Sequence, residues 1–377
     1  MTIRRAAFIH SPQLEKYRYP PKCPFNTQRA GKTRKVLNSM GLLSGPGRSE
    51  VAPVPAERIV LKKFHSARYL HALKTAAQGH WDYEAIDMGI GTSDCPVFRD
   101  MYDCSVWACG ATLTGANLIL SDSADVAFNP SGGLHHAGPE LASGFCYIND
   151  MAIACTILAE AGKKVLYLDV DVHHGDGVQN AFYDRCDVMT ISFHESGRTL
   201  FPGTGFEYDI GTGAGKGYSV NVPLPVGTYD EVYMKAFKAI ALPLIGVYNP
   251  DVIVFELGAD ALAGDPLAHL YLTNNTYAEI INHLLSFSKP ILAAGGGGYN
   301  INNTVRAWAL AWSVMCGAAE HDMNLGAGGV MLESTDWQGG LRDRILIISS
   351  QQRDAVVPQV DATIETVRAN VFPFHGL

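Results

Sequence analysis

The stretch VLYLDVDVHHGDG, residues 165–177, joins an apolar β-strand to a dense group of charged and metal-binding side chains. Its first residues are apolar at successive positions, which is typical of a strand buried inside a parallel sheet. The run nevertheless continues into Asp169, Asp171, His173 and Asp176. An unpaired buried carboxylate costs several kcal/mol, so these charges need a compensating partner. We therefore expect an interior site that has its own source of positive charge.

The spacing of these residues indicates a metal site. Side chains alternate between the two faces of a strand, so Asp169, Asp171 and His173 are expected on one side. Asp171 and His173 can then converge on one ion, and Asp260, which ends the run DVIVFELGAD, is the best candidate for a third ligand. Three protein ligands leave a coordination position open, as in catalytic zinc sites. The alternative is that these residues serve as loop caps, salt-bridge partners or satisfied surface residues.

Short β-branched runs alternate with helical stretches along most of the chain. The predicted strands are AAFIH, DVAFNP, KVLYLDVDV, DVMTISFH, YSVNVPL, DVIVFELGA and KPILAAGG. The predicted helices include NDMAIACTILAEAG, TYDEVYMKAFKAIALPLIGVY, TNNTYAEIINHLLSFS and NTVRAWALAWSVMCG. This alternation predicts a three-layer, doubly wound α/β fold with a mostly parallel sheet and helices on both faces. We interpret residues 41–56 as a surface loop, the chain from about residue 320 as peripheral, and residues 1–377 as one domain.

The bulk composition argues against several classes of protein. With 377 residues, 47% hydrophobic and 18% charged, the chain has an ordinary globular composition. A net charge of −8 argues against a general nucleic-acid binder, and no apolar run approaches the ~20 residues that span a bilayer. The eight cysteines include no C-x-x-C pair, so neither a zinc ribbon nor a disulfide framework is indicated. We expect a cytoplasmic protein with free thiols that binds neither nucleic acid nor membrane.

Five predicted strands end in residues that can do chemistry. AFNP leads into SGGLHHAG, LYLDVDV into HHGDG, ISF into HESGR, VFELGA into DALAGDP, and LAAGGGG into YN. Ligands of open α/β sheets bind beyond the carboxyl ends of the strands, so one shared site is expected. His135 and His136 are further ligands, a general base and acid, or solvated side chains, and Asp169 and Asp176 would orient them. Tyr299 is either a bystander in a tight turn or a phenol aimed at a developing oxyanion.

Together these segments resemble the zinc-dependent deacetylases of the arginase/deacetylase fold, the histone deacetylase family. The resemblance extends from AAFIHSP to RAWALAW. It rests on GGLHHAGPELASGFCYIND, YLDVDVHHGDGVQNAFY, SFHESGRTLFPGTG, YSVNVPL, ELGADALAGDP and GGGGYN. HESGRTLFPGTG and DPLAHLYLTNN are most similar to the bacterial acetoin-utilisation deacetylases. The resemblance implies metal-dependent removal of acetyl, or other acyl, groups from the side-chain amine of lysine in proteins or peptides.

The resemblance also implies roles for single residues. The implied catalytic residues are His135, His136, Tyr299, Asp169 and Asp176. Among them, His136 is the implied general base and acid, and Tyr299 is the implied hydrogen-bond donor to the oxyanion. The implied ligands of one Zn²⁺ per chain are Asp171, His173 and Asp260. The implied substrate-binding residues are Asp94, Gly144, Phe145, Phe201, Leu267 and Arg29. The implied ligands of one structural K⁺ are Asp169, Asp171, His173, Ser192 and Phe193, and those of a second are Phe182, Arg185, Val188 and Tyr218.

The sequence departs from the family at one point, and it leaves alternative functions open. Relatives carry a His-Pro pair where this chain has Cys23-Pro24, so the details of the inner pocket stay open. An acetylated polyamine or another small N-acyl amine is an alternative substrate, although no long extra loop is present to restrict the pocket. A binuclear manganese ureohydrolase would need a second Asp-rich cluster. A non-catalytic module that binds acetyl-lysine would not need His135, His136 and Tyr299. The sequence predicts no oligomeric state.

Overall fold

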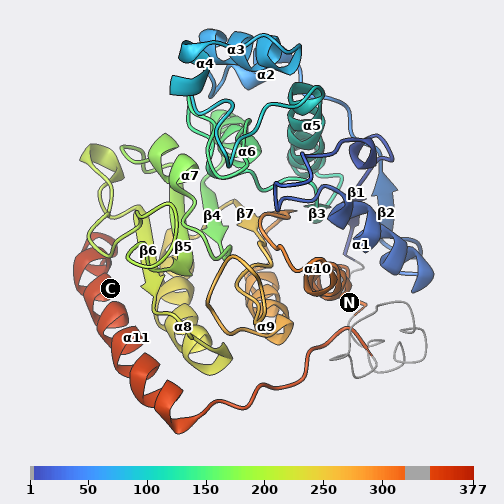
Figure 1. Cartoon of the computed structure of the whole chain (residues 1–377). Helices are drawn as coiled ribbons and strands as arrows, with labels where there is room; N and C mark the ends of the chain where they lie inside the picture. The colour runs from blue at the N-terminus through green and yellow to red at the C-terminus, as the bar shows by residue number, and fades with distance from the viewer. Residues whose placement is uncertain (1–3, 319–339) are drawn as a thin grey trace.

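A parallel β-sheet runs through the middle of the molecule, with helices packed against both of its faces (Figure 1). The computed structural model describes residues 4–318 and 340–377. Within these ranges the sheet has eight strands in the order β2-β1-β3-β8-β7-β4-β5-β6, and every pairing is parallel. The strands are β1 (Ala6–Ile9), β2 (Arg48–Val51), β3 (Val126–Asn129), β4 (Val165–Asp169), β5 (Val188–Glu195), β6 (Ser219–Leu224), β7 (Val252–Glu256) and β8 (Ile291–Ala294). The predicted α/β fold is confirmed.

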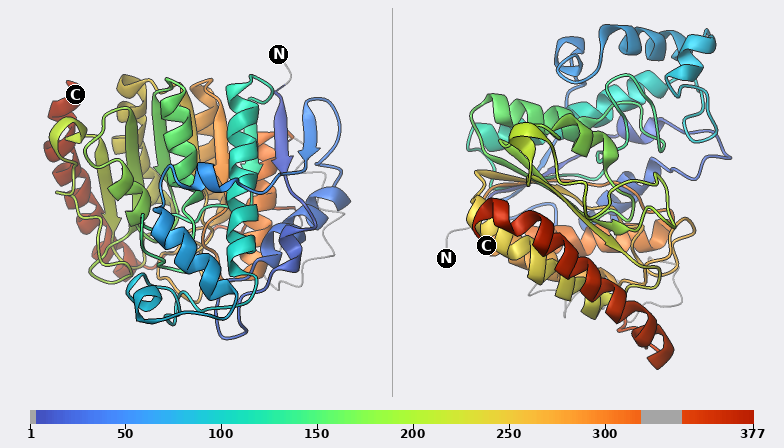
Figure 2. Two further views of the ribbon diagram at one scale, coloured as in Figure 1. Left: turned by 90° about the horizontal axis from the view of Figure 1, so that it is seen from above. Right: turned by 90° about the vertical axis from the view of Figure 1, so that its left-hand side faces the viewer.

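The helices of the described ranges form two layers around this sheet. They are α1 (Gln28–Ser39), α2 (Arg58–Leu61), α3 (Ala67–Ala77), α4 (Tyr83–Asp87), α5 (Met101–Leu120), α6 (Asp150–Glu160), α7 (Asp176–Ala181), α8 (Asp230–Tyr248), α9 (Asn274–Ser286), α10 (Ile301–Met315) and α11 (Ser350–Val371). Helices α5, α6 and α7 cover one face, and α1, α8, α9 and α10 cover the other (Figure 2). Helices α2 to α4 stack outside α5. None of the described helices has the length and apolar character needed to span a bilayer.

Strand β4 shows how the sequence builds both layers. Its side chains alternate, so Leu166 and Leu168 join the core on the side of α8, while Val165 and Tyr167 join the core on the side of α5 and α6. All five residues of the strand are buried. Because both faces are covered, an unbroken apolar run is what a central parallel strand requires. The same alternation places Asp169 on the face of Tyr167, at the carboxyl end of the sheet.

The structure corrects three boundaries. Within residues 41–56, which the sequence predicts to be a loop, Arg48–Val51 form the edge strand β2, which pairs with β1. Its residues are partly or fully exposed and carry no apolar pattern, so no strand signal is present. Strand β4 ends at Asp169 rather than Val172. Residues 319–339 lie outside the described ranges, but the chain beyond them is not merely peripheral, because α11 packs against β6 and α8 along one face.

Candidate active site and metal centre

Five neighbouring strands bring the predicted site residues to one edge of the sheet. Strands β3, β8, β7, β4 and β5 are adjacent in that order. The chain beyond β3 carries His135 and His136, that beyond β8 carries Tyr299, that beyond β7 carries Asp260, and β4 ends at Asp169. Parallel strands share the same carboxyl edge, so residues far apart in sequence meet there.

Asp171, His173 and Asp260 form a buried group that fits a divalent metal ion. His173 Nδ1 lies 3.2 Å from Asp171 Oδ1 and 3.0 Å from Asp260 Oδ2. One ligand atom from each residue lies within 4.8 Å of the others, and all three residues are buried. Two carboxylates with one imidazole are hard and borderline donors of the kind that bind Zn²⁺. Each carboxylate also accepts a backbone hydrogen bond, from Gly297 N–H at 2.6 Å for Asp171 and from Val172 N–H at 3.0 Å for Asp260.

The run of four glycines before Tyr299 is explained by its approach to this group. A Cβ atom on Gly297 would lie 1.8 Å from Asp260 Oδ2, so a side chain cannot be accommodated there. The backbone can therefore pass directly beside the ligand carboxylates and carry Tyr299 into the pocket. The four glycines therefore form a turn and also allow the backbone to pass close to the charged site.

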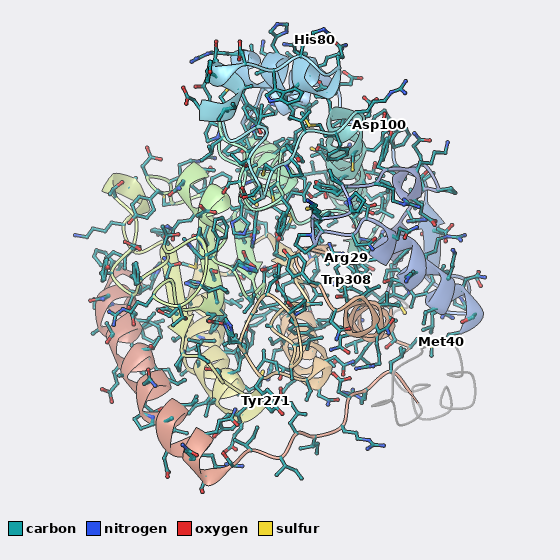
Figure 3. The ribbon with its side chains drawn as sticks, in the orientation of Figure 1. Arg29, Met40, His80, Asp100, Tyr271 and Trp308 are labelled. Atoms are coloured by element: carbon teal, nitrogen blue, oxygen red, sulfur yellow. The ribbon has the colours of Figure 1, made fainter. Side chains whose placement is uncertain are left out.

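Arg29 binds the backbone of the same glycine turn. Its guanidinium donates to the carbonyl oxygens of Gly298 at 2.7 Å and Gly296 at 2.9 Å. It also lies beside Trp308, with Cζ 5.0 Å from the indole centroid (Figure 3). Burial lowers the pKa of Arg29 from its ordinary value. The residue predicted to line the inner pocket thus supports the backbone that positions Tyr299.

His135 and His136 form a hydrogen-bonded pair, each backed by a carboxylate. His135 Nδ1 lies 2.9 Å from Asp169 Oδ2, and His136 Nδ1 lies 2.8 Å from Asp176 Oδ1. The two Nε2 atoms lie 3.1 Å apart. Each carboxylate accepts the Nδ1–H of its histidine, which fixes the tautomer and directs Nε2 toward its neighbour. The predicted pairing of carboxylates with histidines is the one that the structure contains.

The two histidines differ in their tendency to hold a proton. Burial opposes a charge on His135, but Glu256 and Asp169 outweigh it and raise the pKa of His135 well above its usual value. Burial and the neighbouring charge of His135 lower the pKa of His136 to about 4. His135 is therefore suited to carry a positive charge, and His136 is suited to remain a neutral base.

A pocket of about 460 Å³ opens onto these residues. Its lining includes Ser93, Asp94, His136, Gly144, Phe145, His173, Leu200, Phe201, Leu267 and Tyr299. The Phe145 and Tyr299 rings meet edge to face at 5.7 Å, and the Phe201 ring meets His136 in the same way at 5.1 Å. Aromatic walls above polar groups suit a ligand that has a thin apolar stem and a polar end.

The family model for the histone deacetylase domain matches residues 23–315 of this chain. The acetoin utilization protein AcuC of Bacillus subtilis is 41% identical over 323 residues, which cover 84% of this chain and 83% of AcuC. Histone deacetylase 3 of Oryza sativa is 41% identical over 319 residues, covering 83% of this chain and 62% of that protein. The chain belongs to the histone deacetylase family.

Solved structures of the same family share its fold. A histone deacetylase homologue complexed with SAHA superposes with a TM-score of 0.84 at 31% identity, covering 97% of this chain and 100% of that one. A homologue from Aquifex aeolicus gives a TM-score of 0.83 at 30% identity, with the same coverage. The family and its name support hydrolytic deacetylase activity for this protein.

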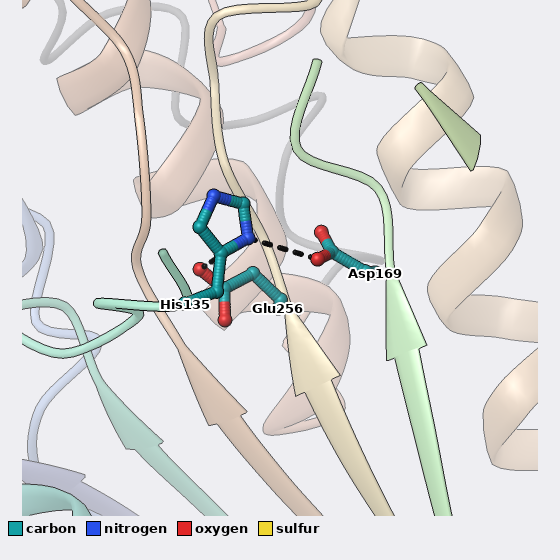
Figure 4. A group of neighbouring side chains, drawn as sticks. All are labelled: His135, Asp169 and Glu256. Carbon is teal, nitrogen blue, oxygen red and sulfur yellow. Dashed lines mark hydrogen bonds and ion pairs between the residues drawn. The ribbon is translucent and has the colours of Figure 1, made fainter. Parts of the chain in front are cut away.

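Glu256 is an acidic residue of the site that the sequence analysis does not predict. Glu256 ends β7 fully buried, with Oε1 3.4 Å from His135 Nδ1 (Figure 4). Tyr167 joins the two acids, since its hydroxyl lies 2.7 Å from Asp169 Oδ2 and 3.1 Å from Glu256 Oε2. Burial raises the pKa of Glu256 well above its usual value. The sequence feature that could have identified Glu256 is a carboxylate at the end of the apolar run VIVFE. The same feature identifies Asp169 at the end of VLYLD.

The predicted residues Asp94, Cys23 and Ser192 lie in three different parts of the structure. Asp94 lies at the pocket, where its Oδ2 accepts the Gly144 N–H at 2.9 Å and so holds the wall that carries Phe145. Cys23 packs, partly buried, against the core on the side of α5 and α6. Asp169 and Ser192, two members of the first predicted potassium set, are register partners across β4 and β5.

The second predicted potassium set lies at the other end of β5. Val188 begins that strand, and the Phe182 carbonyl already accepts the Arg185 N–H at 3.0 Å. The Tyr218 carbonyl accepts the Thr190 N–H at 2.9 Å. These carbonyls keep a second lone pair each, so the set remains a proposal for a structural cation.

Proposed function

We propose that this protein is a zinc-dependent amidohydrolase that removes acetyl groups from acetylated lysine side chains in proteins or peptides. One observation carries the proposal. The group Asp171, His173 and Asp260, the base His136 and the phenol of Tyr299 all gather around one aromatic-walled pocket. The family supports the coarser conclusion of a hydrolytic deacetylase. The aromatic lining supports lysine, because its apolar methylene chain can pack against Phe145 and Phe201 while its amide reaches the polar groups.

A bound Zn²⁺ would polarise the amide carbonyl and lower the pKa of a water molecule. His136 donates its Nδ1–H to Asp176, so its neutral Nε2 carries the lone pair that can take a proton once its 3.1 Å hydrogen bond with His135 Nε2 opens. We infer that this nitrogen accepts the proton of the attacking water and returns it to the departing amine. His135, whose pKa is raised by Glu256 and Asp169, would stabilise the negative charge that develops beside it.

Tyr299 completes the site as a hydrogen-bond donor. Its backbone N–H donates to Asp265 Oδ2 at 2.7 Å, which fixes the start of the side chain. Burial, followed by the charges of Asp260 and Asp171, raises the pKa of Tyr299 well above its usual value. The phenol therefore keeps its proton, and we propose that it donates to the oxyanion of the tetrahedral intermediate.

The structural cations belong to the same proposal. Asp169, Asp171, His173, Ser192 and Phe193 would hold one K⁺ under the active site, where positive charge would offset the buried acids. Acetylated polyamines are the main alternative substrates, since they offer the same amide at the end of a linear chain.

The test compares turnover of an acetyl-lysine peptide with turnover of N-acetylputrescine by the purified, zinc-loaded protein, with and without a hydroxamate inhibitor. We expect hydroxamate-sensitive release of acetate that is fastest from the peptide. Asp260→Asn should abolish it, while Asp361→Asn, which removes an exposed charge on α11, should not. Faster turnover of the polyamine would overturn the substrate class. Two manganese ions per chain would favour the ureohydrolase instead.

A further inference from the structure

Glu195, the last residue of β5, is a buried carboxylate with no part in the proposed chemistry. Its Oε1 accepts hydrogen bonds from Thr199 Oγ1 at 3.0 Å and from His269 Nδ1 at 3.0 Å. Its Oε2 accepts the His269 backbone N–H at 2.8 Å. A buried carboxylate is stable only when its oxygens are paired, so these three bonds hold Glu195 in the interior.

The two partners of Glu195 belong to two different walls of the pocket. Thr199 directly precedes Leu200 and Phe201, and both of these line the pocket. His269, 74 positions from Glu195 in sequence, closely follows Leu267, which lines the pocket from another loop. One buried carboxylate therefore fastens both loops to the end of the same strand.

A second buried carboxylate fixes the other end of the Leu267 loop. Asp265 Oδ1 accepts the Leu267 N–H at 2.9 Å, and its Oδ2 accepts the Tyr299 N–H at 2.7 Å. The Leu267 loop is thus attached to the turn of Tyr299 on one side and to Glu195 on the other. Phe201 is 44% exposed, so core packing restrains it only weakly.

We propose that Glu195 and His269 form a positioning pair that sets the spacing between the Phe201 and Leu267 walls and restricts the pocket to thin, linear side chains. The inference rests on the proposed function, because an acetylated lysine chain is the substrate that must pass these walls. Neither residue of the pair contacts the substrate. They act through Thr199 and the two loops.

Removing either side-chain donor leaves Oε1 of Glu195 with one hydrogen bond instead of two, so the loop that carried the lost donor is held less firmly. Thr199→Val removes one donor while keeping the shape of the side chain. His269→Ala removes the ring donor but keeps the backbone N–H bond. The double variant tests whether both partners act through the same carboxylate.

The experiment measures two quantities for the zinc-loaded variants, and Thr366→Val on the exposed face of α11 is the control. The first is kcat and KM for an acetyl-lysine peptide. The second is the Kd for two hydroxamates, one with a straight alkyl linker and one with a phenylene linker. Each single variant should raise KM by about three- to tenfold with kcat almost unchanged, the loss expected for one hydrogen bond.

The linker preference distinguishes the positioning role from a purely structural one. We expect the variants to lose affinity for the straight linker and to keep or gain affinity for the phenylene linker. Because both donors act on the same oxygen of Glu195, the effects of the two single variants on KM should not simply multiply in the double variant. Unchanged KM and linker preference, even with a lowered melting temperature, overturn the inference. If the wild-type protein does not hydrolyse the peptide, the proposed function fails, but the linker preference still tests the pair. Failure of both hydroxamates to bind the wild type overturns both.

Discussion

Protonation of a single buried histidine should make the stability of this protein depend on pH. His65 precedes α3 and is almost fully buried. Its Nε2 accepts the Asn149 backbone N–H at 2.9 Å, and the Asn149 side chain donates to the carbonyls of His135 at 3.0 Å and Ala137 at 2.9 Å. A proton on Nε2 would turn this acceptor into a donor. His65 must therefore be neutral to support the loop that carries His135.

The magnitude follows from the shift in the pKa of His65. Burial lowers that pKa from 6.5 to about 4 in the folded protein. Between these values the unfolded chain binds a proton that the folded protein does not, so stability is complete above pH 6.5 and is lost as pH falls toward 4. At about 1.4 kcal/mol for each pKa unit, the full loss is about 3 kcal/mol, of which about 2 kcal/mol is lost by pH 5.

Urea unfolding near pH 7.5, 6 and 5 measures this effect. The free energy of unfolding of His65→Gln should fall less steeply with decreasing pH than that of the wild type, by up to about 1.4 kcal/mol per pH unit. The other buried histidines are present in both proteins and cancel in the comparison. His71→Gln, an exposed replacement on α3, should keep the wild-type slope. Equal slopes for the wild type and His65→Gln would refute the reasoning.

Three further changes have defined outcomes. Tyr299→Phe keeps the ring contact with Phe145 and should lower kcat about 10²- to 10³-fold at an unchanged melting temperature, whereas an unchanged rate would remove the phenol from the mechanism. Added Zn²⁺ should raise the melting temperature of the chelator-treated wild type but not of Asp260→Asn, and an equal rise in both would place the ion elsewhere. Leu244→Ala, at a fully buried position of α8, should lower the free energy of unfolding by about 2–5 kcal/mol in urea titrations, and a loss below about 1 kcal/mol would contradict the packing.

Local patterns in the sequence are sufficient to predict the sheet and the residues at its carboxyl edge. Apolar runs buried on both faces predict every strand of the sheet except β2, because a central parallel strand must bury both sides. Polar residues at the ends of β4 and β7 stand out against those runs, as Asp171 and Asp260 do. Strand β2 is not predicted from the sequence, because it is a partly exposed edge strand and needs no apolar pattern.

The tertiary structure alone decides which of these residues touch. The order β3-β8-β7-β4-β5 brings the five chemically active strand ends side by side, and no local pattern encodes this order. Glu256 lies beside His135, and Glu195 accepts a hydrogen bond from His269, because the fold brings together segments that are distant in sequence. Side-chain alternation is a property of a single strand, whereas a hydrogen bond between distant segments depends on how the whole chain packs. The sequence therefore determined the chemistry available to the site, and the fold decided which groups act together.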